Sequence, residues 1–248
     1  MLSTTHLRPA LTGFARRAGA YARSVPGTLV WLTALAVTTL LAGTMSDDQL
    51  AAVLTSQSTN LDNLASRPIE VMIGSAIWDG HAAWWFLLVF AAFHARVERW
   101  LGTWRWLTVV LGAHVIGTLI SQGVVAIAIA RGALPTSMAG TDDYGVSYTL
   151  AGAIGVLAYR FAPTGRVWYA AAVLAVYSVP FWLPAFGPAT FTDIGHLTAL
   201  VVGLGAYPLV ARFARRARTA PIAYSSDQLG QVSNVPRSRT EPMPSPVG

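Results

Sequence analysis

The sequence contains no cysteine and no lysine, and it carries little charge of either sign. The absence of cysteine excludes disulfide bonds, thiol nucleophiles and cysteine-based metal sites. The absence of lysine means that arginine supplies all 17 basic side chains. Charged residues make up 11% of the chain, whereas soluble domains usually carry about 25%. With 54% of its 248 residues hydrophobic, the chain has the composition of an integral membrane protein.

Motifs of metal, nucleotide and nucleic-acid chemistry are missing as well. The sequence has no HExxH pair and no glycine-rich phosphate loop, so neither a metal site nor a cofactor is predicted. His114 stands in "LGAHVIG" without a second ligand four residues on, and we interpret it as a histidine bonded within a helix bundle. The net charge of +6 does not indicate a nucleic-acid partner, because the arginines flank apolar segments as membrane topology requires.

Six apolar segments are long enough, or nearly long enough, to cross a bilayer. A spanning helix needs about 20 mostly apolar residues, with a range of about 17 to 25. The sequence therefore predicts an all-α, polytopic membrane protein with six transmembrane helices. The expected spans are residues 28–44, 81–96, 105–130, 146–161, 166–183 and 193–213.

The arginines predict how these spans are oriented. If the N-terminus is cytoplasmic, four arginines lie before the first span, three lie at or between the facing ends of the second and third, two lie at the facing ends of the fourth and fifth, and six lie at or beyond the inner end of the last. Only Arg67 and Arg131 then lie outside, together with eight of the eleven acidic residues. Because basic residues collect on the cytoplasmic side of membrane proteins, we expect both termini to be cytoplasmic, in a multi-pass protein of the plasma membrane.

The segments outside the spans divide the chain into three parts. Residues 1–27 form a basic cytoplasmic N-terminal tail, residues 28–213 the membrane domain, and residues 214–248 a tail whose Ser, Pro, Gln and Asn content predicts disorder. In the first outer loop, Leu50, Val53, Leu54, Leu61 and Leu64 recur at helical spacing. This pattern predicts one or two amphipathic helices lying at the membrane interface.

The first span has an alternative interpretation. Basic residues, an apolar run and "LAG" also make up the pattern of a cleaved signal peptide. Cleavage would leave five spans and upset the distribution of arginines, so the six-span interpretation is preferred.

Ser147 and His196 occur at matching places on two of the spans. Ser147 begins the fourth span in "DDYGVSYTLAG", and His196 lies at the outer end of the sixth in "TDIGHLTALVVGLG". Residues 145–161 make a helix of only about 24 Å, so Ser147 is expected in a recess below the outer surface. A histidine at this depth is a functional candidate, and it is suited to remove the serine proton.

Small residues on both spans favour contact between them. They are Gly145, Ala151, Gly152 and Gly155 on the fourth span, and Ala199, Gly203 and Gly205 on the sixth. Small residues near fourfold spacing let membrane helices approach closely. Each candidate also has a structural interpretation, in which Ser147 caps or back-bonds its helix and His196 donates to a carbonyl.

These features resemble the rhomboid intramembrane serine proteases. That family has a six-helix core, a G-x-S-G serine opening the fourth helix, and a histidine in A-H-x-x-G-x-x-x-G on the sixth. Here the two motifs read "GVSY" and "GHLTALVVG". "VERWLG" at residues 97–102 looks like the family's motif after the second helix, with Glu98 and Gly102 in place, and "RPIEVMIGSAIW" at residues 67–78 looks like the segment that leads into that helix. The likeness covers residues 28–213 and is nearest to a divergent bacterial rhomboid-like group.

The resemblance implies roles for named residues. It makes Ser147 the nucleophile and His196 the base, and Gly155, eight residues after Ser147, matches a family glycine; Gly155, Ala199 and Gly203 are the small residues expected to pack the two helices together. The sequence also departs from the family, because Tyr148 replaces the glycine after the serine and Ala151 replaces a tyrosine four residues after it.

A second departure concerns the oxyanion. Counting back from "VERWLG" puts Ala82 and Phe86 where the family has the histidine and asparagine that help bind it, and His81 lies one residue from the histidine position. One lost oxyanion donor costs about 10²–10³ in rate. Gly145, Tyr148 and His81 are therefore the candidates to support the oxyanion, together with backbone N–H groups.

The leading function is thus a rhomboid-like intramembrane serine endopeptidase, a hydrolase that cleaves transmembrane segments near the outer face of the bilayer. The alternative is an inactive rhomboid-like pseudoprotease that binds membrane-protein clients. A small-solute carrier would need helices broken near the membrane midplane, and the glycines fit packing instead. The expected partners are membrane-protein substrates or clients and the lipid bilayer, with no oligomeric state indicated.

Overall fold

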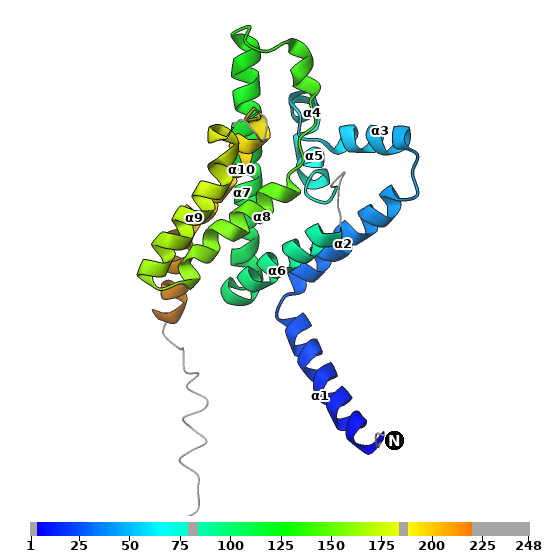
Figure 1. Cartoon of the computed structure of the whole chain (residues 1–248), viewed down its shortest axis with the longest axis vertical. Helices are drawn as coiled ribbons and strands as arrows, with labels where there is room; N and C mark the ends of the chain where they lie inside the picture. Colours follow the sequence, from blue (N-terminus) through cyan, green and yellow to red (C-terminus); the bar gives the residue numbers. More distant parts are fainter. Residues whose placement is uncertain (1–3, 79–83, 184–187, 220–248) are drawn as a thin grey trace, which may run out of the picture. The chain divides into compact units, whose positions relative to one another are not determined.

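The computed structural model describes residues 4–78, 84–183 and 188–219 (Figure 1). Within them every regular element is helical, which confirms the all-α prediction. The chain divides into one unit of residues 1–210 and another of residues 211–248. The elements are α1 (Thr4–Arg23), α2 (Pro26–Ala42), α3 (Asp47–Gln57), α4 (Leu61–Ser66), α5 (Pro68–Gly74), α6 (Trp84–Leu101), α7 (Thr103–Ala130), η1 (Thr136–Gly140), α8 (Val146–Val156), η2 (Leu157–Arg160), α9 (Pro163–Trp182) and α10 (Phe191–Thr219).

Each expected span overlaps one helix or, for the fourth span, two successive helices; these are α2, α6, α7, α8 with η2, α9 and α10. Among the described residues, α7 alone is a single helix long and apolar enough to cross a membrane. A second span is counted if residues 15–23 and α2 are joined across a bend of 93°. The helical core is therefore found, whereas the number of membrane crossings stays a prediction.

The segment expected as a basic N-terminal tail contains a helix, α1, which ends at Arg23. Arg16, Arg17 and Arg23 are exposed on it. Pro26 then opens α2, and proline is favoured at a first helical position because that N–H needs no partner.

The first outer loop holds three short helices, α3, α4 and α5, where one or two were expected. Ser46 and Gln49 form a reciprocal capping box at the start of α3, and Asn60 caps α4 by accepting from the Asn63 N–H. The five apolar residues that marked the helical spacing are all half-buried. The pattern therefore identified the apolar face of this loop correctly.

The most enclosed helix is α8, in which nine of eleven residues are buried. It packs chiefly on α7, and Gly152 lies so close to Ala113 of α7 that a Cβ would collide with it. On the side of α10, Gly155 faces the Leu200 carbonyl and Gly203 faces the Gly152 backbone at distances that also exclude a Cβ. Ser147 is half-buried at the start of this helix.

Helices α2 and α6 lie side by side (Figure 1). In an aromatic cluster between them, Trp31 of α2 contacts Phe90 of α6 and Trp106 of α7 at ring-centroid distances of 5.6 and 5.8 Å. The buried carboxylate of Glu98 on α6 accepts from the N–H groups of Gly27 and Thr28, at 2.8 and 2.7 Å. An acidic side chain on α6 thus caps the N-terminus of α2, where negative charge is favourable.

Candidate functional site

Ser147 and His196 lie in contact. Ser147 is the second residue of α8, His196 lies in the second turn of α10, and the Ser147 Oγ is 2.8 Å from the His196 Nε2. The separation falls in the range expected for a serine and its base. With its ring proton on Nδ1, the imidazole would accept the hydroxyl proton at Nε2. The structure thus brings the two predicted residues together, and their catalytic roles stay predictions.

The contacts of Ser147 and His196 fit a purely structural role, as helix cap and as donor to a carbonyl, less well than they fit a serine–base pair. Gly145, not Ser147, is the N-cap of α8, and no side chain caps that helix. The Ser147 hydroxyl has one other contact, a long one of 3.4 Å to the Tyr144 carbonyl. In the described part of the chain, the imidazole of His196 is bonded to no carbonyl, so Ser147 is its hydrogen-bond partner.

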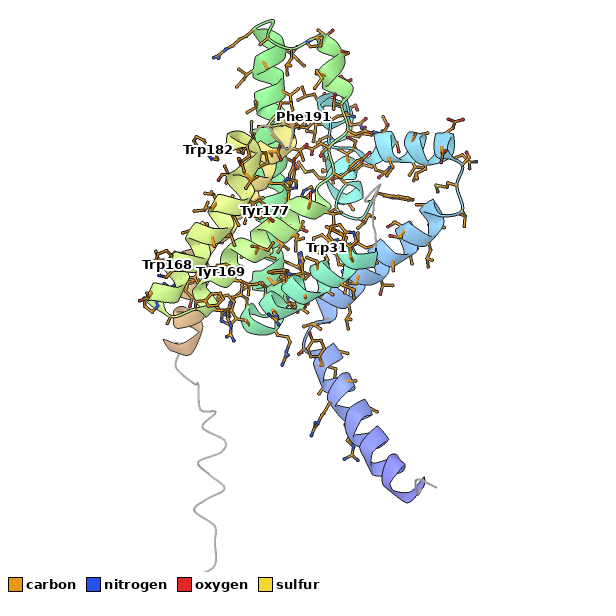
Figure 2. All side chains as sticks on the ribbon, in the orientation of Figure 1. Trp31, Trp168, Tyr169, Tyr177, Trp182 and Phe191 are labelled. Carbon is orange, nitrogen blue, oxygen red and sulfur yellow. The ribbon has the colours of Figure 1, made fainter. Side chains whose placement is uncertain are left out.

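Two tyrosine rings contact the imidazole of His196 edge-on. The Tyr148 ring lies 5.0 Å away at 74°, and the Tyr177 ring, which projects from α9 (Figure 2), lies 6.3 Å away at 71°. The aromatic contact that Ala151 lacks is therefore supplied from other positions. Tyr177 was not identified from the sequence, because nothing in its surroundings on α9 distinguishes it from a lipid-facing or packing tyrosine.

The Tyr148 side chain is fully buried, and its hydroxyl donates to Asp143 Oδ1 at 2.7 Å. Asp143 Oδ2 accepts from Gln122 Nε2 at 3.0 Å and from Ser121 Oγ at 3.2 Å. Burial raises the pKa of Asp143 above its ordinary value, against the opposing effect of these hydrogen bonds. Since its hydroxyl is directed to Asp143, Tyr148 contacts the imidazole through its ring.

The first outer loop holds the entrance of α8 in place. The Asp143 N–H donates to Ser58 Oγ at 2.8 Å, and the Thr59 N–H donates to the Asp143 carbonyl at 2.9 Å. The N–H groups of Gly145 and Val146 donate to the Ser75 carbonyl at 3.0 and 3.2 Å. These bonds satisfy N–H groups at the start of α8, which would otherwise be orphaned, and they fix the backbone that carries Ser147.

The donors that surround Ser147 are few. The N–H groups of Tyr148 and Thr149 donate to the Gly145 carbonyl, whereas the Ser147 N–H makes no backbone hydrogen bond within the described residues. His81 and Ala82 lie outside the described residues, so the predicted role of His81 in supporting the oxyanion stays a prediction. Phe86 is half-buried and packs in the aromatic cluster of α2 and α6.

Gly145 has a clear steric reason to be glycine. A Cβ at this position would collide with the His114 ring. His114 is buried on α7, and its Nε2 lies 2.9 Å from the Met72 carbonyl, a bond within the bundle as predicted. No group of three potential metal ligands is found in the described part of the chain.

A pocket of about 190 Å³ opens beside His196 and is lined by Val176, Tyr177, Pro180, Asp193 and His196. Asp193 lies one turn before His196, and its Oδ2 accepts from the N–H and hydroxyl of Thr190, both at 2.8 Å. Asp193 therefore anchors the start of α10. The pocket leaves the imidazole in contact with an open, mostly apolar space.

A family model described as "Rhomboid-like protein" matches residues 20–216, a range that contains both Ser147 and His196. Searches among curated proteins and among solved structures returned no match.

Proposed function

The chain belongs to the rhomboid-like protein family, and we propose that it is an intramembrane serine endopeptidase with Ser147 as nucleophile and His196 as general base. The observation that carries the proposal is the 2.8 Å separation between Ser147 Oγ and His196 Nε2. A serine hydroxyl needs such an adjacent base to become nucleophilic.

In the proposed reaction, Ser147 Oγ attacks the carbonyl carbon of a peptide bond while its proton passes to His196 Nε2. The tetrahedral intermediate collapses when the imidazolium returns that proton to the leaving amine, and an acyl-enzyme on Ser147 remains. A water molecule, deprotonated by His196, then hydrolyses the ester and restores the hydroxyl.

The negative charge on the substrate oxygen would be stabilised mainly by the backbone. The Ser147 N–H is the available donor of the first turn of α8, and the positive end of the helix dipole adds to it. The Tyr148 and Tyr177 rings would keep the imidazole facing Ser147. Asp143 would act through Tyr148, whose hydroxyl it accepts, and is therefore a positioning residue.

The proposed setting is the plasma membrane, with both termini cytoplasmic and Ser147 in a recess near the outer face. Substrates would be transmembrane segments of other proteins, which enter a membrane domain of residues 28–213. The tails of residues 1–27 and 214–248 take no part in the proposed chemistry.

A second candidate function is that of a rhomboid-like pseudoprotease, which binds membrane-protein clients without cleaving them. The observation that favours it is the scarcity of oxyanion donors: Tyr148 is turned toward Asp143, and Phe86 brings an apolar ring to a position where the family has asparagine. A single backbone N–H gives less stabilisation than the family's full set of donors.

Labelling with a serine-directed fluorophosphonate distinguishes these functions. We expect purified wild type to be labelled, and Ser147→Ala and His196→Ala each to lose labelling and cleavage of a reconstituted membrane substrate, because the two residues act as one unit. Ser178→Ala is the matched control, since the Ser178 hydroxyl only back-bonds to Ala175 on α9. Equal labelling of wild type and Ser147→Ala would rule out Ser147 as the nucleophile. Failure of wild type to react, with clients still bound by Ser147→Ala, would favour the pseudoprotease.

A further inference from the structure

A second pocket, of about 630 Å³, lies at the opposite end of α8 from Ser147. Its lining combines three arginines with aromatic side chains: Arg96, Arg99, Arg160, Trp100, Phe161 and Tyr169. These residues come from the end of α6, from η2 and the residue after it, and from the first turns of α9. From Ser147 to Arg160 the helical rise is about 20 Å, so this pocket is separate from the Ser147–His196 site.

The three guanidinium groups have no counter-charge in the described part of the chain, where the only ion pair joins Arg67 and Glu70. None of the three donates a hydrogen bond to another described side chain or carbonyl. Glu98, the acid nearest to them in sequence, is buried and accepts from the N-terminus of α2 and from the Thr103 hydroxyl. The pocket therefore concentrates positive charge that the protein itself does not neutralise.

Aromatic rings hold two of these guanidinium groups in place. Arg160 lies over the Trp100 ring at 5.6 Å, and Arg99 lies over the Tyr21 ring at 4.8 Å. Trp100 is itself stacked on Tyr207 at 5.4 Å. Cation–π contact uses the face of a guanidinium and leaves its N–H edge available. The arginines are thus positioned in advance to bind an acceptor with several oxygens.

The remaining wall of the pocket is apolar. Phe161 stacks on Tyr169 at 4.8 Å, the Tyr169 hydroxyl donates to the Ile154 carbonyl at 3.0 Å, and Phe93 and Leu157 complete the surface. A free anion would use the guanidinium groups alone and leave this wall without a partner. A phospholipid would use both, because its phosphate is tethered through glycerol esters to apolar acyl chains.

We propose that this pocket binds the phosphate group of an anionic phospholipid in the cytoplasmic leaflet. The arginine distribution puts this end of α6, α8 and α9 on the cytoplasmic side, where anionic lipids attract basic residues near the surface of the membrane. Arginine forks match phosphate oxygens bidentately, while Phe161 and Leu157 would contact the first methylenes of the acyl chains. Binding at this pocket is independent of any reaction at Ser147.

Lipid binding to the full-length protein in nanodiscs of phosphatidylcholine tests the proposal, with phosphatidylglycerol added as the probe. Each arginine near a charged surface contributes about 1 kcal/mol, which corresponds to about a fivefold change in affinity. We therefore expect Arg99→Gln with Arg160→Gln to weaken phosphatidylglycerol binding about 25-fold. Arg160→Lys should weaken binding less, since lysine keeps the positive charge and loses only the bidentate hydrogen bonding of the guanidinium group. Circular dichroism of each variant establishes that it has folded.

Arg131→Gln is the matched control, because Arg131 is an exposed arginine that follows the C-terminal end of α7 and does not line the pocket. We expect this variant to bind phosphatidylglycerol as wild type does. Ser147→Ala should also bind normally, which separates this site from the proposed catalysis. The proposal is overturned if phosphatidylcholine and phosphatidylglycerol bind equally, or if Arg131→Gln loses as much affinity as the double variant. It is likewise overturned if glycerol phosphate, which has no acyl chain, displaces the lipid at equal concentration.

Discussion

At the residue scale, the two departures next to Ser147 and His196 compensate each other. The rhomboid pattern has a small residue after the serine and alanine before the histidine, whereas this chain has Tyr148 and Gly195. A Cβ on Gly195 would collide with the hydroxyl and ring of Tyr148, and one on Gly117 would lie 3.4 Å from the Tyr148 ring. The tyrosine therefore occupies space that the glycine before His196 leaves open.

This pairing predicts that the effects of two substitutions will not add. Gly195→Ala should destabilise the protein by about 1–3 kcal/mol, as overpacking does, and Tyr148→Ala by about 3–5 kcal/mol, as loss of a large buried side chain does. With Tyr148 already truncated, Gly195→Ala should cost almost nothing. Unfolding in mixed micelles, measured for both single variants and the double variant, gives the coupling. Gly112→Ala serves as control, because nothing lies within 4 Å of its added Cβ. Additive losses would show that the two sites are independent.

The buried carboxyl of Asp143 predicts a dependence of stability on pH. Its ordinary pKa is 3.8, and burial raises this value in the folded state. The folded protein then binds the proton more tightly than the unfolded chain, so the free energy of unfolding falls as the pH rises from about 4 toward the raised pKa. Asp143→Asn, which cannot ionise, should abolish that slope.

Unfolding midpoints in detergent between pH 4 and pH 8 measure this slope. Asp142→Asn is the control, because Asp142 is exposed and should leave the wild-type slope unchanged. A slope that survives in Asp143→Asn would have to come from another group.

The sequence predicted part of this site and missed the rest for a physical reason. Ser147 and His196 were found because each stands at the outer end of an apolar span, where a polar side chain needs an explanation. Asp143 was counted as one of the acids that mark the outer side. Its burial depends on Ser121 and Gln122 of α7 and on Ser58 of the outer loop, and no spacing in the sequence specifies which distant donors will surround it.

At the scale of elements, the contact between α8 and α10 depends on particular glycines. Gly203 faces the backbone of Gly152, which cannot move aside as a flexible side chain can. We expect Gly203→Ala to cost about 1–3 kcal/mol and to separate Ser147 from His196. Gly205→Ala, two residues on, meets nothing within 4 Å and should be neutral or slightly stabilising, since alanine is the better helix former. Unfolding midpoints and fluorophosphonate labelling of both variants test this, and equal effects would refute it.

The end of α6 shows how a charged residue can belong to a helix beyond its apolar part. The second span was expected to end at residue 96, before the charges of "VERW", but α6 continues to Leu101. Glu98 is buried because it caps α2, and Gly102, at φ 82°, ends the helix in a conformation that favours glycine. Hydropathy identifies the apolar part of a helix, so it could not predict that this helix continues past residue 96 to a buried glutamate.

At the scale of the whole membrane unit, α9 carries exposed tryptophans near both its ends, Trp168 and Trp182 (Figure 2). Their 14-residue separation corresponds to about 21 Å. Tryptophan is enriched at both membrane–water interfaces, so these side chains fit a helix that crosses much of the bilayer. Residues 146–160 of α8 and η2 are similarly short, about 21 Å against about 30 Å of hydrocarbon. Ser147 would then lie below the outer surface.

The topology that joins these features is itself testable. We expect a reporter fused after residue 248 to be cytoplasmic and one inserted beside Asp142 to be external, because fifteen of the 17 arginines then lie inside. Alkaline phosphatase, active only outside, and a fluorescent protein, active only inside, give opposite signals at the two positions. The test matters because α7 alone has the length and hydropathy of a span by itself among the described helices. An external tail would place the Arg96, Arg99 and Arg160 pocket away from the anionic leaflet. It would remove the reason to expect lipid there, while the contact between Ser147 and His196 would stand.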